Sequence, residues 1–161
     1  IGLHRGPVIM GIIGDEKRND VNVLSDAVNI ASRLESLTRP LNSQIIVSQS
    51  TLGEVSDQSF FTYRNLGRYR LKGKSQATDL FEIIDAEDNV SRNLKTKTYN
   101  TYNLAIESFN KGSFNIAKEY FQLVLQENPA DKLCQRFIDR ISTLEKSPIP
   151  TDWDSGEVME K

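Results

Sequence analysis

Asn29 and Arg33 are the two residues whose types and spacing most clearly predict chemistry in this chain. They lie four residues apart in a segment with the apolar spacing of a helix, just after a short apolar strand. That spacing places an amide and a guanidinium on one stripe of a helix, one turn apart. A guanidinium held in this way suits phosphate oxygens, because its planar fork donates several hydrogen bonds at once. The pair therefore predicts a site for a phosphorylated ligand.

The helix that carries this pair is predicted to begin at about Asp26 and to run to about Thr38. Either Ser25 or Asp26 can cap it, because a short side-chain oxygen accepts a hydrogen bond from a free backbone N–H at a helix start. Pro40 is expected to end the helix. Three apolar residues recur at about helical spacing and are expected to face a core: Val28, Ala31 and Leu34.

Short strands rich in Val, Ile and aromatic residues are expected on both sides of this helix. They are predicted over residues 3–13 in two pieces broken by Gly6 and Pro7, and over 21–24, 44–48, 60–65, 67–72 and 80–84. Residues 15–20 are expected to form a charged hairpin tip, and residues 50–55 one or two helical turns. His4, the single histidine, is expected to take a hydrogen-bonded role on a buried strand.

Four motifs follow one another in the first half of the chain: IGLHRG at residues 1–6, GIIG at 11–14, DAVNIASR at 26–33 and LKGK at 71–74. In this order they resemble the class III nucleotidyl cyclases, which make cyclic AMP or cyclic GMP. The resemblance covers residues 1–86. It implies an α+β fold, namely the C-terminal half of a ferredoxin-like cyclase catalytic domain.

The resemblance also implies roles for three polar residues. Arg33 would stabilise the phosphoryl transition state, and Asn29 would orient the ribose. Lys72 would hold the terminal phosphates of the nucleotide. These roles fit a fixed guanidinium, an amide that both donates and accepts, and a compact ammonium.

The residue at the base-recognition position does not decide between ATP and GTP as the substrate. Asn22 stands where the family reads the base, a place often held by Asp or Thr in adenylyl cyclases and by Cys in guanylyl cyclases. An Asn side chain can donate and accept, so it could satisfy adenine or guanine. The backbone of Val23 and Leu24 would line the same pocket. ATP and GTP both remain candidate substrates.

Metal ions and a second protomer are implied by the family rather than by residues of this chain. The family's two metal-binding aspartates lie before the position that is Ile1 here, so ligands for magnesium or manganese are expected upstream and no metal ligand is assigned within the chain. Family members act as dimers, with one protomer supplying the metal carboxylates and the other the Asn–Arg helix. A sheet without its N-terminal strands would also have exposed edges that favour oligomers or strand exchange.

The resulting expectation is part of an enzyme that converts ATP to cyclic AMP and pyrophosphate, inactive as this piece alone. One alternative is a guanylyl cyclase. Another is a non-catalytic dimerisation or interaction module derived from a cyclase.

The second half of the chain has a different composition. Residues 87–97 are polar and charged and are expected to form a linker. Three helical patterns follow over residues 98–146, and four of their residues resemble one tetratricopeptide repeat: Gly112, Ala117, Phe121 and Pro129. One repeat cannot bury a continuous core, so it is expected to pack on the cyclase part or on a protein partner. Residues 147–161 are expected to form an extended tail.

Composition excludes several other classes of function. The chain has 161 residues, enough for one or two small domains, and a net charge of −2, which predicts no nucleic-acid partner. One cysteine, Cys134, excludes an internal disulfide and fits a cytoplasmic location. One Cys and one His cannot build a Cys/His metal site. No apolar run approaches the ~20 residues that span a bilayer, so no membrane contact is expected within this chain, although a tether upstream stays open.

Overall fold

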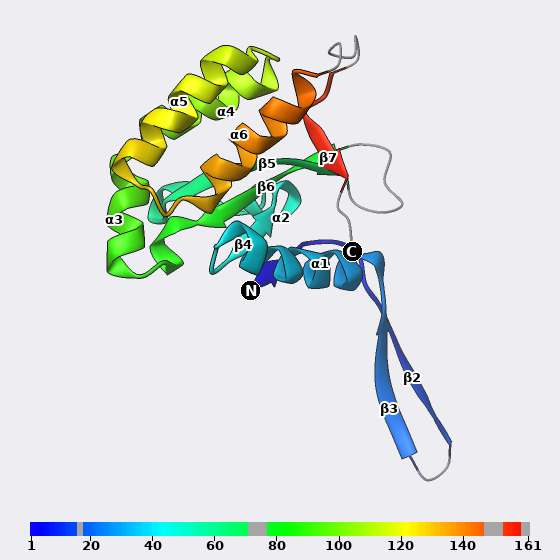
Figure 1. The fold of residues 1–161 in the computed structure, drawn as a ribbon. Coiled ribbons are helices and arrows are strands. Elements are labelled where there is room, and N and C mark those ends of the chain that lie inside the picture. The colour runs from blue at the N-terminus through cyan, green and yellow to red at the C-terminus, as the bar shows by residue number, and fades with distance from the viewer. Residues whose placement is uncertain (16–17, 71–76, 147–152, 159–161) are drawn as a thin grey trace.

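The computed structural model describes residues 1–15, 18–70, 77–146 and 153–158, with the backbone alone for residues 12–24. It has a mixed α+β fold (Figure 1). The elements are, in order, β1 (Gly2–Leu3), β2 (Ile9–Asp15), β3 (Arg18–Leu24), α1 (Asp26–Leu41), β4 (Ile46–Ser48), α2 (Gln49–Leu52), η1 (Gln58–Phe60), β5 (Tyr63–Arg70), β6 (Ala77–Ile83), η2 (Ile84–Ala86), α3 (Asn89–Lys97), α4 (Tyr99–Asn110), α5 (Phe114–Glu127), α6 (Lys132–Leu144) and β7 (Gly156–Val158).

Five of the strands form one sheet in the order β1-β4-β6-β5-β7. The pairs β1–β4 and β5–β7 are parallel, while β4–β6 and β5–β6 are antiparallel. Helix α1 connects the parallel strands β1 and β4, as expected for a β-α-β crossover. Strands β2 and β3 form a separate antiparallel hairpin, which projects away from the rest of the molecule (Figure 1).

Strand β5 differs from the sequence prediction, which divided it into two strands at residues 60–65 and 67–72. The structure has one strand whose register with β6 shifts between Asn65 and Gly67. Leu66 is the extra residue of this β-bulge, because Asn65 pairs with Phe81 and Gly67 with Leu80. Gly67 has a φ of 102°, a backbone conformation that glycine adopts readily, so the glycine that suggested a strand boundary lies at a bulge within a single strand.

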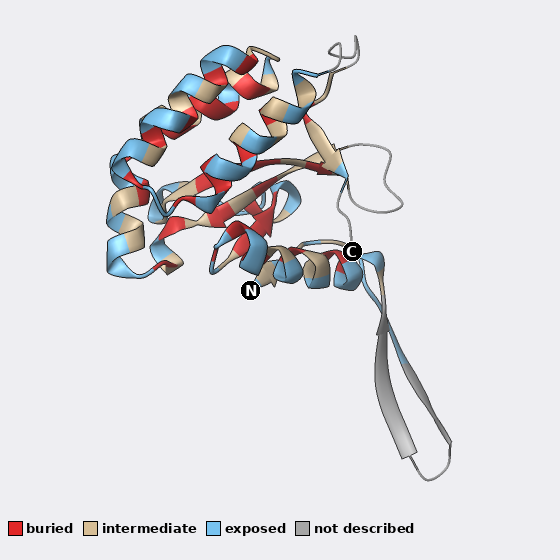
Figure 2. Ribbon diagram, in the orientation of Figure 1, coloured by how far each residue is buried: buried red, intermediate tan, exposed pale blue. Residues whose placement is uncertain are grey.

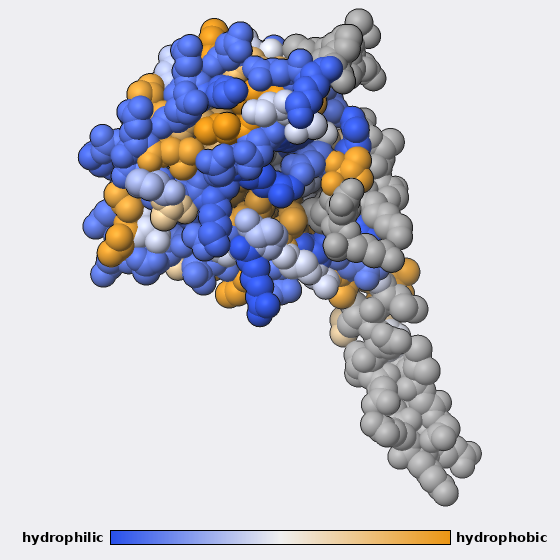
Figure 3. Space-filling view, in the orientation of Figure 1, coloured by the Kyte–Doolittle hydropathy of each residue, from blue (hydrophilic) through white to orange (hydrophobic). Residues whose placement is uncertain are grey.

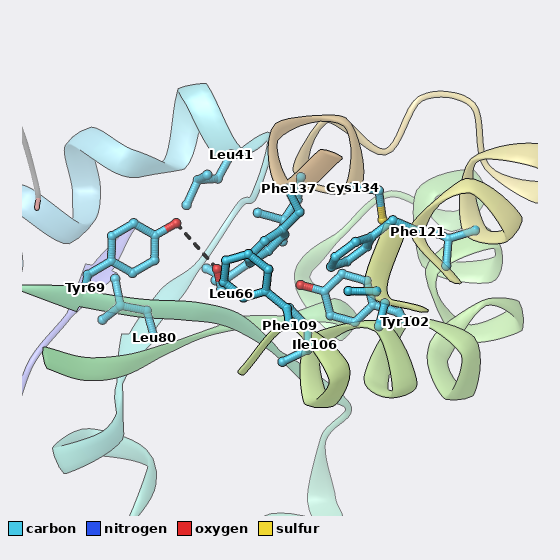
Figure 4. Packing of buried hydrophobic residues seen from close by; sticks show 14 of the residues in the cluster. Leu41, Leu66, Tyr69, Leu80, Tyr102, Ile106, Phe109, Phe121, Cys134 and Phe137 are labelled. Carbon is cyan, nitrogen blue, oxygen red and sulfur yellow. Dashed lines mark hydrogen bonds between the residues drawn. The ribbon is translucent and has the colours of Figure 1, made fainter. Parts of the chain in front are cut away.

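The core is continuous from α1 through the sheet to the last helices (Figure 4). Leu34 of α1, Leu66 of β5 and Leu80 of β6 are completely buried. The same cluster contains aromatic residues from α4, α5 and α6: Tyr102, Phe109, Phe114, Phe121 and Phe137. The helices thus pack on the sheet, which is one of the two arrangements expected from the sequence. The comparison of Figure 2 with Figure 1 shows buried residues on the inner sides of these helices and exposed residues outside.

The breaks between the last three helices lie where the sequence predicted them. Helix α4 ends at Asn110, and Gly112 follows with a φ of 74°. Helix α5 ends at Glu127, just before Asn128 and Pro129. Glycine after a helix end takes the left-handed conformation without a side-chain clash, and proline cannot continue a helix.

Residues 87–97, expected to be a linker, form helix α3 over most of their length. The Asp88 carboxylate caps this helix by accepting hydrogen bonds from the N–H groups of Val90 and Ser91, at 2.9 and 3.0 Å. Lys95 is only 4% exposed and contacts both Glu82 and Glu87 at 2.9 Å. The charges that suggested a solvated linker instead include a buried ion-pair partner.

Arg64 of β5 is the centre of this buried charge cluster. Its side chain is 1% exposed and forms ion pairs with Glu82 of β6 and with Asp131, which precedes α6. Burial alone would lower the pKa of Arg64, but the two carboxylates hold that pKa above its usual value. The guanidinium also lies 4.3 Å from the ring centroid of Tyr102 in α4. Arg64 therefore connects the sheet to the helices that follow it.

The described part of the expected extended tail, residues 153–158, is also tied to the body. Strand β7 pairs with β5, so that Arg70 lies opposite Val158. Trp153 lies 5.7 Å from Phe109 and 5.3 Å from Phe114 between ring centroids, both edge to face. This part of the tail covers an edge of the sheet that would otherwise be unpaired.

Candidate functional site

Helix α1 begins at Ser25, one of the two capping residues that the sequence allowed. Ser25 has extended backbone angles, and its hydroxyl accepts a hydrogen bond from the Ala27 N–H at 2.9 Å. The same hydroxyl donates to the Pro7 carbonyl at 2.5 Å. Asp26 instead lies in the first turn, where a carboxylate interacts favourably with the helix dipole. The start of α1 is thus capped and tied to the loop that follows β1.

The end of α1 lies beyond the predicted Thr38, because Pro40 does not stop the helix. The helix continues to Leu41, and Asn42 follows with a φ of 51°. Pro40 is exposed and lies in the last turn, where its missing N–H removes only one helical hydrogen bond. The N–H groups of Asn42 and Ser43 donate back into that turn and satisfy its carbonyls.

The core-facing stripe of α1 differs in phase from the prediction. Its buried members are Ala27, Ile30, Leu34, Thr38 and Leu41. Val28, which was expected in the core, is 46% exposed, and Ala31 is half-buried. Leu34 belongs to both sets and both have helical spacing, so the correct one is fixed by the side of the helix that packs on the sheet.

Asn29 and Arg33 lie away from this buried stripe, as the four-residue spacing predicted. Asn29 is exposed and Arg33 is half-buried. Neither side chain has a hydrogen-bond or ion-pair partner among the residues that the structure describes. Figure 2 shows exposed residues along α1 on the side away from the sheet. An amide and a guanidinium are therefore presented together, with their donors available to a ligand.

The other predicted site residues are only partly located. Asn22, Val23 and Leu24 end strand β3 and lead directly into the α1 cap, with backbone pairing to Gly11, Met10 and Ile9 of β2. Their side chains lie outside the described part of the structure. Lys72 lies outside the described residues altogether. The structure therefore brings Asn29 and Arg33 together on one helix, and the roles of all six residues stay predictions.

His4 makes the hydrogen bond that the sequence predicts, but it follows strand β1 and does not lie on a buried strand. Its Nδ1 lies 2.8 Å from the Ser48 hydroxyl of β4, and the residue is half-buried. Within the described ranges there is no group of three or more His, Cys, Asp or Glu side chains that could hold a metal ion. No helix in those ranges is long and apolar enough to cross a membrane.

Two glycines that the sequence analysis did not connect with the site lie directly against α1. Gly2 is in β1, and Gly6 is in the loop after it. A Cβ atom added to either would meet atoms of α1 at less than 3.0 Å. The position of both glycines within the motif IGLHRG was the only sequence signal for this close contact with α1.

Comparison with known proteins assigns the chain to a family. The model of the adenylate and guanylate cyclase catalytic domain matches residues 1–102. The terminal-differentiation specific adenylate cyclase of Dictyostelium discoideum is 35% identical over 154 residues, which cover 92% of this chain and 7% of that protein. Guanylate cyclase 2G of Mus musculus is 40% identical over 78 residues, covering 48% of this chain and 7% of that protein.

Solved structures are also similar over part of the chain. A bacterial light-regulated adenylyl cyclase is 30% identical, with a TM-score of 0.43 over 56% of this chain and 43% of that one. The chain thus spans less than a tenth of the length of the two curated relatives described above. From the family model, which covers more than half of its residues, the chain belongs to the adenylate and guanylate cyclase catalytic domain family.

Proposed function

We propose that this chain supplies the ribose- and phosphate-binding helix of an adenylate cyclase that converts ATP to cyclic AMP and pyrophosphate. The observation that carries the proposal is the pair Asn29 and Arg33, which have no partner among the described residues and lie one turn apart on a helix fixed by its cap and its buried stripe. Membership of the cyclase family supports the reaction class. Similarity to a Dictyostelium adenylate cyclase over most of the chain favours ATP.

The reaction is an attack of the ribose 3′-hydroxyl on the α-phosphate, with pyrophosphate as the leaving group. Negative charge accumulates on phosphate oxygens in the transition state, so donors fixed in advance lower the barrier. Arg33 would donate its planar fork to those oxygens, and Asn29 would orient the ribose. Lys72 would hold the terminal phosphates.

The base would lie against the end of β3. Asn22 would contact it through a side chain that both donates and accepts, and the backbone of Val23 and Leu24 would complete the pocket. Because such a residue can serve either purine, a guanylyl cyclase is the second candidate function. The 40% identity to a mouse guanylate cyclase supports that candidate.

The ligands for magnesium or manganese at this site would lie outside the described residues. The described residues contain no group of three or more His, Cys, Asp or Glu side chains, so they do not form a binding site for a metal ion by themselves. We place the metal carboxylates on a second cyclase protomer, with the active site between the two.

An apolar surface beside the site supports this dimer. Val8, Ile9 and Met10 lead into the projecting hairpin and are 51%, 73% and 68% exposed. Val28 of α1 is also exposed, one residue before Asn29. Neighbouring apolar side chains that face solvent are typical of protein interfaces. A protomer bound there would lie next to the nucleotide.

We also propose that α4 and α5 form one tetratricopeptide-like pair whose inner face is occupied by α6 and by strand β5 of its own chain. A protein partner would then have to bind the outer face, where Leu104, Ile116 and Leu123 are 46%, 50% and 47% exposed. Figure 3 shows apolar patches over the helical part of the molecule, within a mainly hydrophilic surface.

The test is the substitution Arg33→Ala in the intact protein that contains this chain. Loss of one transition-state donor is expected to lower kcat by about 10²–10³-fold. Arg39→Ala is the matched control, because Arg39 is an exposed arginine in the last turn of the same helix. Assays with ATP and GTP side by side assign the substrate. A loss of less than about threefold for Arg33→Ala, roughly 0.6 kcal/mol, would refute its role.

A further inference from the structure

We propose that Gly2 and Gly6 are positioning residues for the nucleotide site, because their missing side chains set how closely α1 lies to β1. The proposal rests on the proposed function of Asn29 and Arg33. It concerns the placement of the helix that carries them and not contact with the nucleotide.

Gly2 lies against the middle of α1. A Cβ atom at this position would be 2.3 Å from the Ala31 carbonyl oxygen and 2.3 Å from the Glu35 nitrogen. Both are backbone atoms, so no rotation of a side chain can relieve the clash. Since carbon contacts are comfortable only at about 3.5 Å or more, the helix would have to withdraw by roughly 1 Å. Ala31 and Glu35 flank Arg33 on both sides in the sequence.

Gly6 lies against the first turn of α1. A Cβ atom there would be 2.8 Å from the Ala27 Cβ. The next residue, Pro7, accepts the 2.5 Å hydrogen bond from the Ser25 hydroxyl that caps the helix. Gly2 and Gly6 thus contact α1 on either side of Asn29, and together they fix both the distance and the tilt of the helix.

The site depends on this placement because its two side chains have no described partners that hold them. Their positions follow the helix backbone directly. A displacement of about 1 Å in a group that must meet reacting atoms can reduce a rate by about 10²-fold. Packing at Gly2 is therefore expected to affect the chemical step.

The first experiment is Gly2→Ala in the intact protein, with kcat and KM measured for ATP and folding followed by thermal melting. We expect kcat to fall by about 10²-fold in a protein that still folds. If the substitution acts by displacing Arg33, then Gly2→Ala combined with Arg33→Ala should be about as active as Arg33→Ala alone. Losses that multiply in the double variant would overturn the proposal.

The second experiment uses the contact between two side-chain positions. Gly6→Ala is expected to lower kcat, and adding Ala27→Gly should restore it, because the second change removes the atom that the new methyl group meets. Failure of Ala27→Gly to restore kcat would contradict the role of Gly6. This pair also decides the question if Gly2→Ala does not fold. Gly53→Ala is the control, because Gly53 has helical backbone angles and its Cβ would lie 3.2 Å from the Gln49 carbonyl oxygen without meeting any atom of α1 within 4 Å.

The outcomes separate this inference from the proposed function. If Arg33→Ala retains activity, the proposed function itself fails. If Arg33→Ala loses activity while Gly2→Ala and Gly6→Ala do not, the function stands and the positioning role is wrong.

Discussion

Substitution of Arg64 tests whether the buried charge cluster holds the helices on the sheet. Arg64 donates to Glu82 through Nε and to both Asp131 oxygens, at 2.6 and 3.1 Å. In Arg64→Ala, Glu82 keeps Lys95 as a partner at 2.9 Å. Among the described residues, Asp131 keeps only a backbone hydrogen bond, from the Cys134 N–H at 3.3 Å. The variant therefore leaves a nearly unpaired carboxylate in the core.

Breaking a buried ion pair in this way is expected to cost about 3–5 kcal/mol in the free energy of unfolding. That cost is a large share of the ~5–15 kcal/mol that stabilises a typical domain, so the urea midpoint should fall far below that of the parent protein. The measurement is urea unfolding followed by circular dichroism and by the fluorescence of Trp153. Because Trp153 packs on α4 and α5, its signal reports on the helices directly.

The control is Lys111→Ala, which breaks an exposed pair with Glu107 at 2.6 Å, one turn apart on the helix surface. Exposed pairs of this kind contribute about 0.3–0.5 kcal/mol. If Arg64→Ala costs no more than about 1 kcal/mol, the cluster is not a buried network in solution, and the argument that it fixes the helices is wrong.

Two more predictions concern the same packing. Burial alone would raise the pKa of Asp131, but the Arg64 guanidinium holds this pKa below its usual value. The ionised Asp131 therefore stabilises the fold above the unfolded pKa of about 3.9, and this stabilisation is lost as the pH falls through the folded pKa. Asp131→Asn should therefore show a flatter decline in unfolding free energy below about pH 4 than the parent, and an equal decline would contradict this assignment. Trp153→Ala removes two edge-to-face contacts from a partly buried side chain and is expected to cost about 2 kcal/mol by urea unfolding, whereas an unchanged midpoint would show that the tail does not pack.

The helix that carries the site could be predicted from the sequence because its signals are local. Ser25 is a short polar residue before an amphipathic segment, and Asn29 and Arg33 are four residues apart. The phase of the buried stripe could not be fixed in this way. Val28 with Ala31 and Ala27 with Ile30 have the same spacing, and only the packing of the folded chain distinguishes them.

The charged segment 87–97 was misjudged for a different reason. Composition reports how many charges a segment has, but not whether their partners come from elsewhere in the fold. Lys95 pairs with Glu82, thirteen residues earlier, and Glu82 is buried in β6. A solvated lysine and a buried, paired lysine look identical in a sequence window. The roles of Asn22 and Lys72 likewise stay predictions, since they depend on a nucleotide and on parts of the chain outside the described residues.

The extent of the cyclase family match and the extent of the folded unit are different in this chain. The family model ends at residue 102, within α4. Yet the Tyr102 hydroxyl donates to the Asn65 carbonyl at 2.6 Å, beside the bulge of β5, and Phe137 of α6 lies where a Cβ on Gly67 would be 3.0 Å from its ring. A protein cut at residue 102 would lose Asp131 and the aromatic residues of α5 and α6. It would expose the buried leucines of β5 and β6, and Arg64 would lose one of its two carboxylates. The 92% coverage by the Dictyostelium enzyme fits this view, because similarity that continues past the family model is expected when the later helices complete the core on which α1 rests.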